Sequence, residues 1–459
     1  MTLSSAEQKR IHGELSHVNA AFLDFVQANP ECLEEESFAA LDQLEEAVRW
    51  PLQPWPIFLN DEKVQEGAQK AIGLCRLVKS IPQRVFEFDV EGLAKFYGLE
   101  PEHARLASIY FRQQDWQKQL LARPDFMFTP DGFRCLECNL VGNLGGWEGK
   151  RWADAYHDVP VVARFLEESR TEVRCTDIVR KLLTHMLRHG VGKFRTKELN
   201  IAFVVGDLVE RMVPFIEQVR EEYGKLLEAL GLSGVALLLN LDELEACGEE
   251  VWGQGHRLHS VVEQTNGPSS PLLYRSWVWG RVLLYNGPFS GILTDKRNLA
   301  ILSQLQDSDR FDDQEQKLLR EALPWTRLVA SEPLDHGLRS AVPEEIRQDK
   351  DHLILKPGDR LGGDGVVIGA LVSDDDWARS LDLALQEGDW VVQERVVSPP
   401  YRYLLRGQGP QVHDIVFSFF VVGDDYGGGF LRLAPLNPSG VVNVAQGTAV
   451  QSPIFEVDR

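Results

Sequence analysis

The sequence predicts an α+β protein in which mixed and antiparallel sheets follow a helical N-terminal region. Residues 1–120 place apolar side chains three and four positions apart, which is the period of amphipathic helices. Near residue 123 the apolar period changes to two, as in strands with one buried face. Residues 199–244 read as strand, helix and strand, which predicts a β-α-β unit.

A chain of 459 residues is too long for one ordinary domain, so we expect several packed regions that share a site. Four regions follow from the changes of pattern: a helical region at 1–120, a hairpin with helices at 121–195, the β-α-β region at 196–290, and a helix-rich then strand-rich region at 291–459.

The composition excludes several classes of partner. Hydrophobic residues make up 44% and charged residues 25%, which is ordinary for a globular protein, but the net charge is −21. A nucleic acid or an anionic membrane would be repelled by that charge, so we expect neither as partner. The longest apolar runs, such as 415–422, have the length of a strand, and the first residues carry no apolar signal core. We therefore expect a cytoplasmic protein whose six irregularly spaced cysteines are reduced.

Residues 123–139 predict a β-hairpin. Its turn is the tetrapeptide TPDG at 129–132, where Pro and Asp suit the centre of a type I turn and Gly suits the left-handed position after it. We expect the three-residue loop with a glycine bulge, which pairs Thr129 with Phe133.

This pairing places Asp125 opposite Glu137 and Arg123 opposite Asn139. Because side chains alternate between the two faces of a strand, one face becomes polar and the other apolar. The polar face is predicted to hold Arg123, Asp125, Met127, Cys135, Glu137 and Asn139, and the apolar face Pro124, Phe126, Phe128, Leu136 and Cys138.

Two chemistries compete within this hairpin. The C-x-x-C pair resembles a metal or redox motif, but the predicted pairing turns Cys135 and Cys138 to opposite faces, and no second Cys or His pair follows at zinc spacing. Asp125 and Glu137 would repel each other at about 5 Å unless neutralised, and with the amide of Asn139 they form an oxygen-rich set that suits Mg²⁺. A solvated face in which an arginine neutralises the acids is an equally good explanation of the spacing alone.

A second candidate is the segment LILKPGDRLGGDGVVIG at 353–369. It predicts a strand that ends at Lys356, a loop with Gly362 and Gly363, and another strand. Glycines let backbone amides approach phosphate oxygens, and the lysine adds a point charge. The lysine precedes the glycines, so the segment is not a P-loop, and a flexible β-hairpin is the commoner explanation.

Three further segments carry candidate binding side chains. Gln393 and Glu394 interrupt the apolar strand 390–397, where they suit adenine and ribose or, alternatively, a sheet edge in water. Lys296 lies at the start of a predicted helix, where the helix dipole disfavours a structural lysine but favours a phosphate. Arg432 lies among small residues near the end of the sequence.

Together these segments resemble the circularly permuted ATP-grasp ligases, the group that includes glutathionylspermidine synthetase and eukaryotic glutathione synthetase. The hairpin matches the R-x-D and E-x-N pattern of that group at Arg123, Asp125, Glu137 and Asn139. The first lysine segment of that group is similar to TDKRNLAIL here. Its second lysine and glycine lid are similar to ILKPGDRLGGDG, and its adenine hinge is similar to VVQERV. The resemblance covers roughly residues 120–459, and the E-x-N pair precedes the lysines, as the permuted order requires.

The resemblance implies an ATP-dependent carboxylate–amine ligase that forms an amide or peptide bond through an acyl phosphate and releases ADP and phosphate. It implies that 121–195 holds the metal, that 196–290 lies on the substrate side, and that 291–459 binds the nucleotide. By the resemblance, Asp125, Glu137 and Asn139 bind Mg²⁺, and Arg123 contacts the transferring group and the oxyanion. Lys296 and Lys356 bind phosphate, and Gly362 and Gly363 belong to a lid at 358–365 that closes over the site. Gln393 and Glu394 bind the adenosine, and Arg432 contacts the γ-phosphate or a substrate carboxylate. Either Asp359 or Asp364 could add a metal contact near the lid.

The implied partners are small molecules, one carboxylate and one amine, with amino acids or a peptide as the expected substrates and a homodimer as a common assembly of the group. Two other functions stay open. The chain could be a nucleotide-binding protein without catalysis, although opposed acids then have no physical purpose, or a phosphotransferase that modifies a small molecule without ligation.

Overall fold

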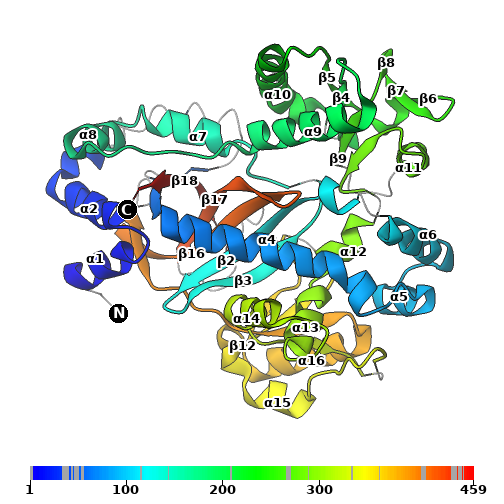
Figure 1. Ribbon diagram of the computed structural model, residues 1–459. Helices are drawn as coiled ribbons and strands as arrows, with labels where there is room; N and C mark the ends of the chain where they lie inside the picture. The colour runs from blue at the N-terminus through cyan, green and yellow to red at the C-terminus, as the bar shows by residue number, and fades with distance from the viewer. Residues whose placement is uncertain are drawn as a thin grey trace.

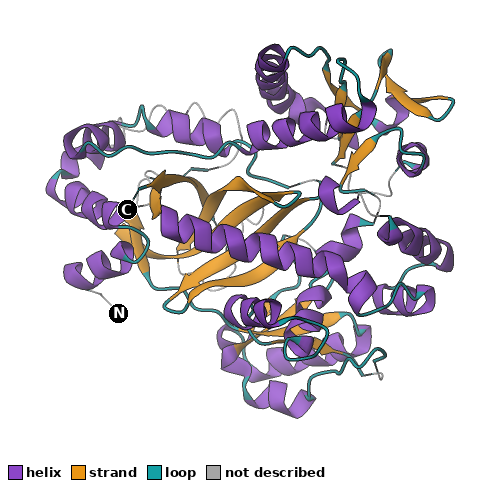
Figure 2. Cartoon of the chain, in the orientation of Figure 1, coloured by secondary structure: helices purple, strands orange, loops and turns teal. Residues whose placement is uncertain are grey.

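The computed structural model describes residues 4–33, 41–42, 45, 51–52, 56–113, 116–142, 144–206, 209–264, 270–287, 289–331, 334–360, 362–404, 410–435, 442, 447 and 449–458. It confirms the α+β class (Figure 2). Across these residues, no helix combines the length and the apolarity that crossing a bilayer requires.

The central element is a sheet with seven strands among the described residues, built from both ends of the chain (Figure 1). The pairing is antiparallel except for one parallel pair between its first two strands. Its order is β1 (Ile57–Asn60), β18 (Val450–Val457), β17 (Asp425–Pro435), β16 (Pro410–Val422), β2 (Leu121–Thr129) and β3 (Gly132–Asn139), and β15 (Tyr401–Leu404) also pairs with β16. One strand, β1, therefore lies inside the region that was predicted to be helical.

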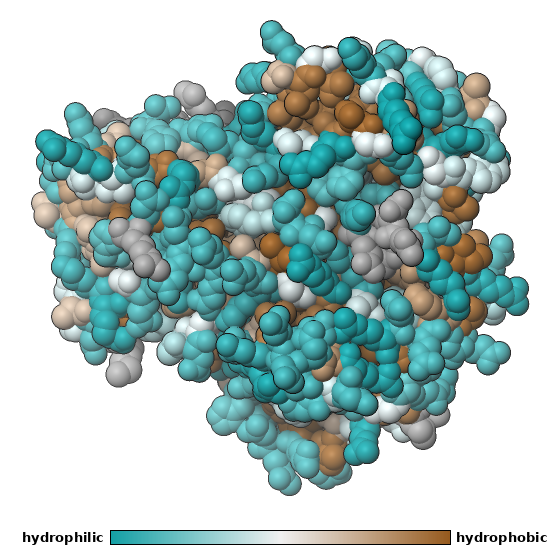
Figure 3. Space-filling model, in the orientation of Figure 1, coloured by the Kyte–Doolittle hydropathy of each residue, from teal (hydrophilic) through white to brown (hydrophobic). Residues whose placement is uncertain are grey.

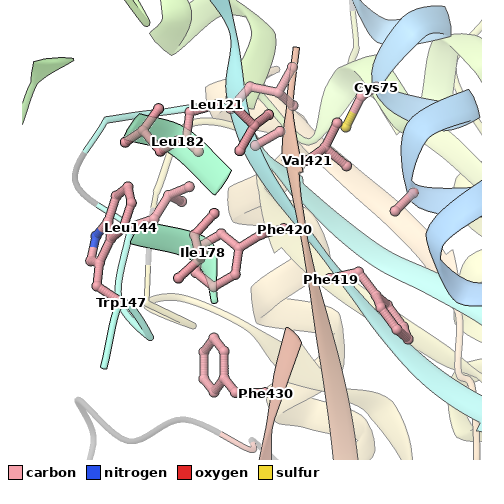
Figure 4. Packing of buried hydrophobic residues seen from close by; sticks show 14 of the residues in the cluster. Cys75, Leu121, Leu144, Trp147, Ile178, Leu182, Phe419, Phe420, Val421 and Phe430 are labelled. Atoms are coloured by element: carbon pink, nitrogen blue, oxygen red, sulfur yellow. The ribbon is translucent and has the colours of Figure 1, made fainter. Parts of the chain in front are cut away.

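Helices cover both faces of this large sheet. The long helix α4 (Asp61–Arg84) crosses one face, while α7 (Gly149–Tyr156) and α9 (Ile178–Phe194) pack on the other (Figure 1). Neighbouring residues of β16 show why two layers are needed, because Phe419 points toward α4 whereas Phe420 points toward Trp147 (Figure 4). Both phenylalanines are buried, so the strand has no face that is left for water.

Gly67 of α4 allows this helix to approach the sheet closely. A Cβ atom at this position would overlap the buried ring of Phe419. Gly67→Ala is therefore expected to lower the unfolding midpoint, because overpacking costs about 1–3 kcal/mol and exceeds the helical advantage of alanine, about 1 kcal/mol. Gly224→Ala in α10 (Val209–Leu230) is the matched control, since its Cβ would meet no atom within 4 Å. Thermal unfolding of both variants tests this, and a midpoint that rises equally in both would contradict the packing argument.

A separate parallel sheet confirms the predicted β-α-β unit, with α10 joining two of its strands (Figure 1). Its order is β10 (Leu283–Tyr285), β9 (Ser260–Glu263), β4 (Ile201–Val204) and β5 (Ala236–Leu239). A small meander of β6 (Leu244–Cys247), β7 (Glu250–Gly253) and β8 (His256–Arg257) follows β5. The face of the molecule in Figure 3 is mostly hydrophilic, with an apolar area at the upper right over α10 and this sheet.

A third, antiparallel sheet carries the glycine-rich segment. Its order is β11 (Thr326–Val329), β14 (Trp390–Glu394), β12 (Leu353–Pro357) and β13 (Val367–Ile368), and α15 (Pro343–Gln348) and α16 (Asp374–Glu387) pack with it. The buried side chains of Trp377, Leu381 and Trp390 form a hydrophobic core that is separate from the main one. We call the described residues of 326–394 the small-sheet unit.

The remaining α-helices surround these sheets. They are α1 (Ser5–Gly13), α2 (His17–Ala28), α5 (Val90–Tyr97), α6 (Pro101–Arg112), α8 (Pro160–Ser169), α11 (Pro271–Val278), α12 (Ser290–Thr294), α13 (Arg297–Leu305) and α14 (Asp313–Ala322). The two ends of the described chain lie near each other at the left of Figure 1.

Candidate functional site

The β2–β3 hairpin forms with the predicted functional register but with a different turn. Asp125 pairs with Glu137 and Arg123 with Asn139, as predicted. Thr129, however, pairs with Gly132 and not with Phe133, so the predicted three-residue loop is wrong. The extra residue lies in β3 instead, where a bulge at Leu136 shifts the ladder between the turn and Asp125.

The bulge also overturns the predicted separation of the two thiols. Cys135 pairs opposite Phe126, Cys138 pairs opposite Pro124, and the two Sγ atoms lie 3.7 Å apart on the buried side of the hairpin. Leu136, which was predicted to lie in the core, faces the cavity described below. Both cysteines are free, and burial together with the bond from Cys135 raises the pKa of Cys138. Among the residues that the structure describes, no three His, Cys, Asp or Glu side chains group to hold a metal.

Six predicted residues from separate parts of the chain meet at one cavity between the large sheet and the small-sheet unit. The cavity has a volume of about 140 Å³. The predicted residues that line it are Asp125, Glu137, Lys296, Lys356 and Arg432, together with Gly363 of the lid loop. Nine apolar side chains also line the cavity, namely Met127, Leu136, Ile354, Val366, Ile368, Val396, Val397, Val416 and Val442. A positive, partly apolar slot therefore lies in a strongly acidic protein.

Asp125 is buried and held by several donors. Its carboxylate lies 2.7 Å from Arg432 Nη2 and 3.3 Å from Arg123 Nε, and Ser418 Oγ donates to it at 2.6 Å. Although burial alone would raise the pKa of Asp125, the two arginines and the hydroxyl hold it well below the usual range. In this arrangement the arginines supply the neutralisation that the opposed acids require.

Glu137 and Asn139 are the other two residues predicted to bind the metal, and only Glu137 lines the cavity. The Asn139 side-chain amide donates to Asp125 at 3.1 Å and to Glu137 at 3.3 Å, so the three polar groups are in direct contact. Glu137 is partly exposed toward the cavity, beside Lys356. Two carboxylates next to lysines fit a magnesium ion that is shared with phosphate oxygens, because that ion takes few protein ligands and completes its shell from phosphate and water.

Lys356 lies at the centre of the slot. Its ammonium donates to Gln393 Oε1 at 2.6 Å and to the carbonyl oxygen of Leu136 at 3.2 Å. Burial lowers the pKa of Lys356 to about 8, Lys296 adds to that effect, and Glu137 opposes it. Gln393 is itself buried and donates to Thr326 at 3.1 Å, so it fixes the lysine and does not line the cavity.

Lys296 and the glycine-rich loop form the opposite wall. Lys296 is the N-cap residue of α13, as predicted, and its ammonium donates to the carbonyl oxygen of Arg360. Gly362 and Gly363 both have positive φ, at 71° and 77°, a conformation that glycine adopts without steric cost. The glycine-rich loop therefore covers the ammonium group of Lys296.

Five of the predicted residues do not line the cavity, namely Arg123, Asn139, Gly362, Gln393 and Glu394. Arg123 donates to the carbonyl oxygen of Gly145 at 3.0 Å, and its Cζ lies 5.5 Å from the ring centroid of Phe430. It contacts Asp125 but is not part of the cavity lining. Glu394 is exposed and accepts from the backbone amide of Trp325 at 3.1 Å, which is a structural contact at the sheet edge. Asp359 and Asp364 are exposed, and neither lines this cavity.

The sequence interpretation missed residues that complete the lining. Arg395 and Asp414 line the cavity, and Ser418 holds Asp125. Ile354 could have been found, because it precedes Lys356 by two positions in one strand and so shares its face. Ser418 carried no sequence signal, since it reaches Asp125 only through the non-sequential pairing of β16 with β2.

Comparison with protein-family models finds no match, and comparison with curated proteins finds none either. The fold is similar to the solved structure of a glutathione synthetase-like effector from Globodera pallida in its apo form. The TM-score is 0.58 with 11% sequence identity, over 89% of this chain and 90% of that chain. A D-alanyl-alanine synthetase A from Vibrio cholerae O1 biovar eltor matches at a TM-score of 0.27 and 12% identity, over 49% of this chain and 67% of that chain, which is too low to carry an argument.

Proposed function

From the fold shared with a glutathione synthetase-like protein, we propose that this chain is an ATP-dependent carboxylate–amine ligase of the ATP-grasp type. It would form an amide or peptide bond between small molecules, through an acyl phosphate, with release of ADP and phosphate. The expected substrates are amino acids or a small peptide.

One observation carries this proposal, the meeting of Lys296, Lys356, Arg432, Asp125 and Glu137 at a single cavity between two antiparallel sheets. Three cations and two acids suit a triphosphate that is bound together with a divalent ion. The apolar remainder of the slot suits the flat face of a base. Asp125 accounts for the burial of Arg432, but only neutral oxygens hold Lys296 and Lys356, and a bound polyphosphate would explain why these two lysines are buried there.

Asp125, Glu137 and Asn139 would hold the magnesium ion, which would supply charge neutralisation for the phosphates when bound. Lys296 and Lys356 would position the α- and β-phosphates, and Arg432 would bind the γ-phosphate or the substrate carboxylate. Gln393 would keep Lys356 aimed at the phosphates through its 2.6 Å hydrogen bond. Arg123 would act from behind Asp125, near the transferring group.

The cavity volume of about 140 Å³ is below the roughly 300 Å³ that small-molecule pockets usually reach. We therefore propose that the loop 358–365 and the small-sheet unit move away to admit the nucleotide. Their return would exclude water, which otherwise hydrolyses an acyl phosphate.

The depressed pKa of Lys356 predicts a pH dependence of nucleotide binding. Below pH 8 the lysine carries its charge and attracts phosphate, and above pH 8 the free protein increasingly loses that charge. The Kd for ATP, measured by calorimetry between pH 7 and 9.5, is expected to rise as the pH passes about 8. Lys356→Gln should bind weakly at every pH, and the exposed control Lys317→Gln should keep the wild-type profile. A wild-type Kd that stays constant over this range would contradict the assignment.

The assay that tests the function measures ADP and phosphate release from ATP and Mg²⁺ with pairs of amino acids, with products read by mass spectrometry. A ligase releases ADP only when a carboxylate and an amine are both present. Release with a single substrate that becomes phosphorylated would identify a phosphotransferase, and ATP binding without any release would identify a binding protein. AMP as product would contradict the proposal.

We also propose the permuted order of the ATP-grasp elements and the division of labour among the four regions. The large sheet supports the order, because the hairpin at 121–139 pairs with β16, beyond the lysine segments, and not with a sequential neighbour. A homodimer and a cytoplasmic location stay predictions, and light scattering tests the first of them.

A further inference from the structure

A second cavity, of about 1060 Å³, lies on the other side of Lys296 from the candidate site. Asp295 and Arg297 line this cavity while Lys296 between them lines the first one, and the two cavities share no lining residue. Its walls come from α5, α6, α11 and α12 on one side and from the small-sheet unit on the other. The volume is at the upper end of the range for small-molecule sites, roughly 300–1,000 Å³.

Aromatic side chains form the wall on the helical side. Phe96 and Tyr97 at the end of α5, Tyr274 of α11 and Phe289 before α12 all line the cavity. The guanidinium of Arg297 already lies over Phe96 and Tyr97, 5.0 Å and 5.7 Å from their ring centroids. Tyr274 and Phe289 therefore offer the apolar surface on which an aromatic or aliphatic group of a ligand can pack.

The charges of the cavity are mainly negative. Five acids line it, namely Asp295, Asp335, Asp359, Glu387 and Asp389, against the two cations Lys95 and Arg297, which gives a formal charge of −3 when the histidines are neutral. Arg297 pairs with Asp295 at 2.5 Å and Lys95 with Asp335 at 2.8 Å, so both cations are already engaged. Glu387 lies 3.4 Å from Arg360, beyond the lining.

Asp359 and Asp389 are the acids without such a partner. Within the described residues neither has a cation at ion-pair distance, and Asp389 Oδ1 is buried there without a hydrogen-bond partner. Burial raises the pKa of Asp389, the charge of Arg297 opposes that rise, and the charge of Asp359 adds to it. The C-terminal end of α16, which carries negative partial charge, precedes Asp389 directly.

We propose that this second cavity binds an organic cation, with an amine or guanidinium group between Asp359 and Asp389 and an apolar portion against the aromatic wall. Such a group would donate to the Asp359 and Asp389 carboxylates at the cavity wall and relieve the repulsion between them. An anion of the same shape would meet the same acids and be excluded. The site does not depend on the proposed ligase activity.

The test uses the full chain and three probes of one shape, phenylbutylamine, phenylbutanol and phenylbutyrate, titrated by calorimetry. We expect the amine to bind at least ten-fold more tightly than the alcohol, which is about 1.4 kcal/mol, and the carboxylate not to bind. Equal binding of amine and alcohol, or no binding of the amine, would overturn the proposal.

Variants locate the amine. Asp389→Asn is expected to weaken amine binding at least ten-fold. Asp382→Asn, at an exposed acid within α16 that pairs with Arg347 at 2.8 Å and does not line the cavity, should leave the binding unchanged. The raised pKa of Asp389 means that the fold disfavours its charged form, so the Asn variant should keep the unfolding midpoint. Unchanged binding by Asp389→Asn, or loss of binding in Glu137→Gln, would place the amine elsewhere and overturn the proposal.

Discussion

Glu137→Gln is expected to lower ATP turnover about a thousand-fold or more while the protein stays folded. Both opposed acids line the cavity, and Glu137 is the more exposed of the two, with a 3.3 Å hydrogen bond from Asn139. The Gln side chain keeps that contact but removes the charge that a divalent ion needs, and loss of such a ligand removes several kcal/mol of transition-state stabilisation. The measurement is ADP release at saturating ATP and Mg²⁺, with the substrate pair that the ligase assay identifies.

The control is Glu344→Gln on α15, an exposed acid of the small-sheet unit that should keep wild-type turnover. Thermal unfolding must show a midpoint for Glu137→Gln close to that of the wild type. Turnover above about a tenth of the wild-type rate would remove Glu137 from the metal set, because a lost metal ligand costs far more than ten-fold.

Asp125→Asn is expected to destabilise the protein by roughly 3–5 kcal/mol, since it leaves two buried arginines without their counter-charge. Arg123 and Arg432 are 12% and 10% exposed, and both lie against this carboxylate. Because the folded pKa of Asp125 is lowered, its contribution is complete above the ordinary value of 3.8 and is lost as the pH falls below it. The loss in the variant is therefore expected at neutral pH, and the wild type should approach the variant only in acid.

Denaturant unfolding measures this effect, with Ser418→Ala as the milder comparison. Ser418→Ala removes one hydroxyl bond to Asp125 and should cost about 1 kcal/mol. The double variant Asp125→Asn/Arg432→Gln should be more stable than the sum of the single effects predicts, because the second change removes a charge that the first had left unpaired. Additive effects would show that Arg432 and Asp125 do not stabilise each other.

The hairpin shows how far the sequence alone reaches. Alternation along two strands predicts the opposition of Asp125 and Glu137, and the structure confirms it. The prediction placed one extra residue in the turn, and the structure places it in β3 at Leu136. The predicted and observed pairings therefore differ between the turn and Leu136, and they agree from the Asp125–Glu137 pair to the open end of the hairpin. Cys135 and Leu136 are therefore the residues whose faces were predicted wrongly, each lying on the face predicted for the other. The pairing of Asp125 with Glu137 is not affected.

The surroundings of the site were less predictable, because they depend on contacts between distant strands. Gln393 was recognised as a polar interruption of an apolar strand, but nothing local shows that it holds Lys356 and does not contact a base. Arg432 was recognised as a cation near small residues, whereas its contact with Asp125 depends on the order of β17, β16 and β2 in the sheet. Strand order of this kind is a property of the whole chain and leaves no signal in a short window of sequence.

Leu136 has a consequence beyond the register. A hairpin without Leu136 would keep every residue pair between 123 and 139. Leu136 is therefore needed neither for the pairing of the strands nor for the turn. What it adds is a carbonyl group outside the ladder, and that carbonyl accepts the hydrogen bond from Lys356. Lys296 and Arg432 likewise rest on protein oxygens, those of Arg360 and Asp125. An arriving polyphosphate would thus take the place of protein oxygens that hold these three cations while the site is empty.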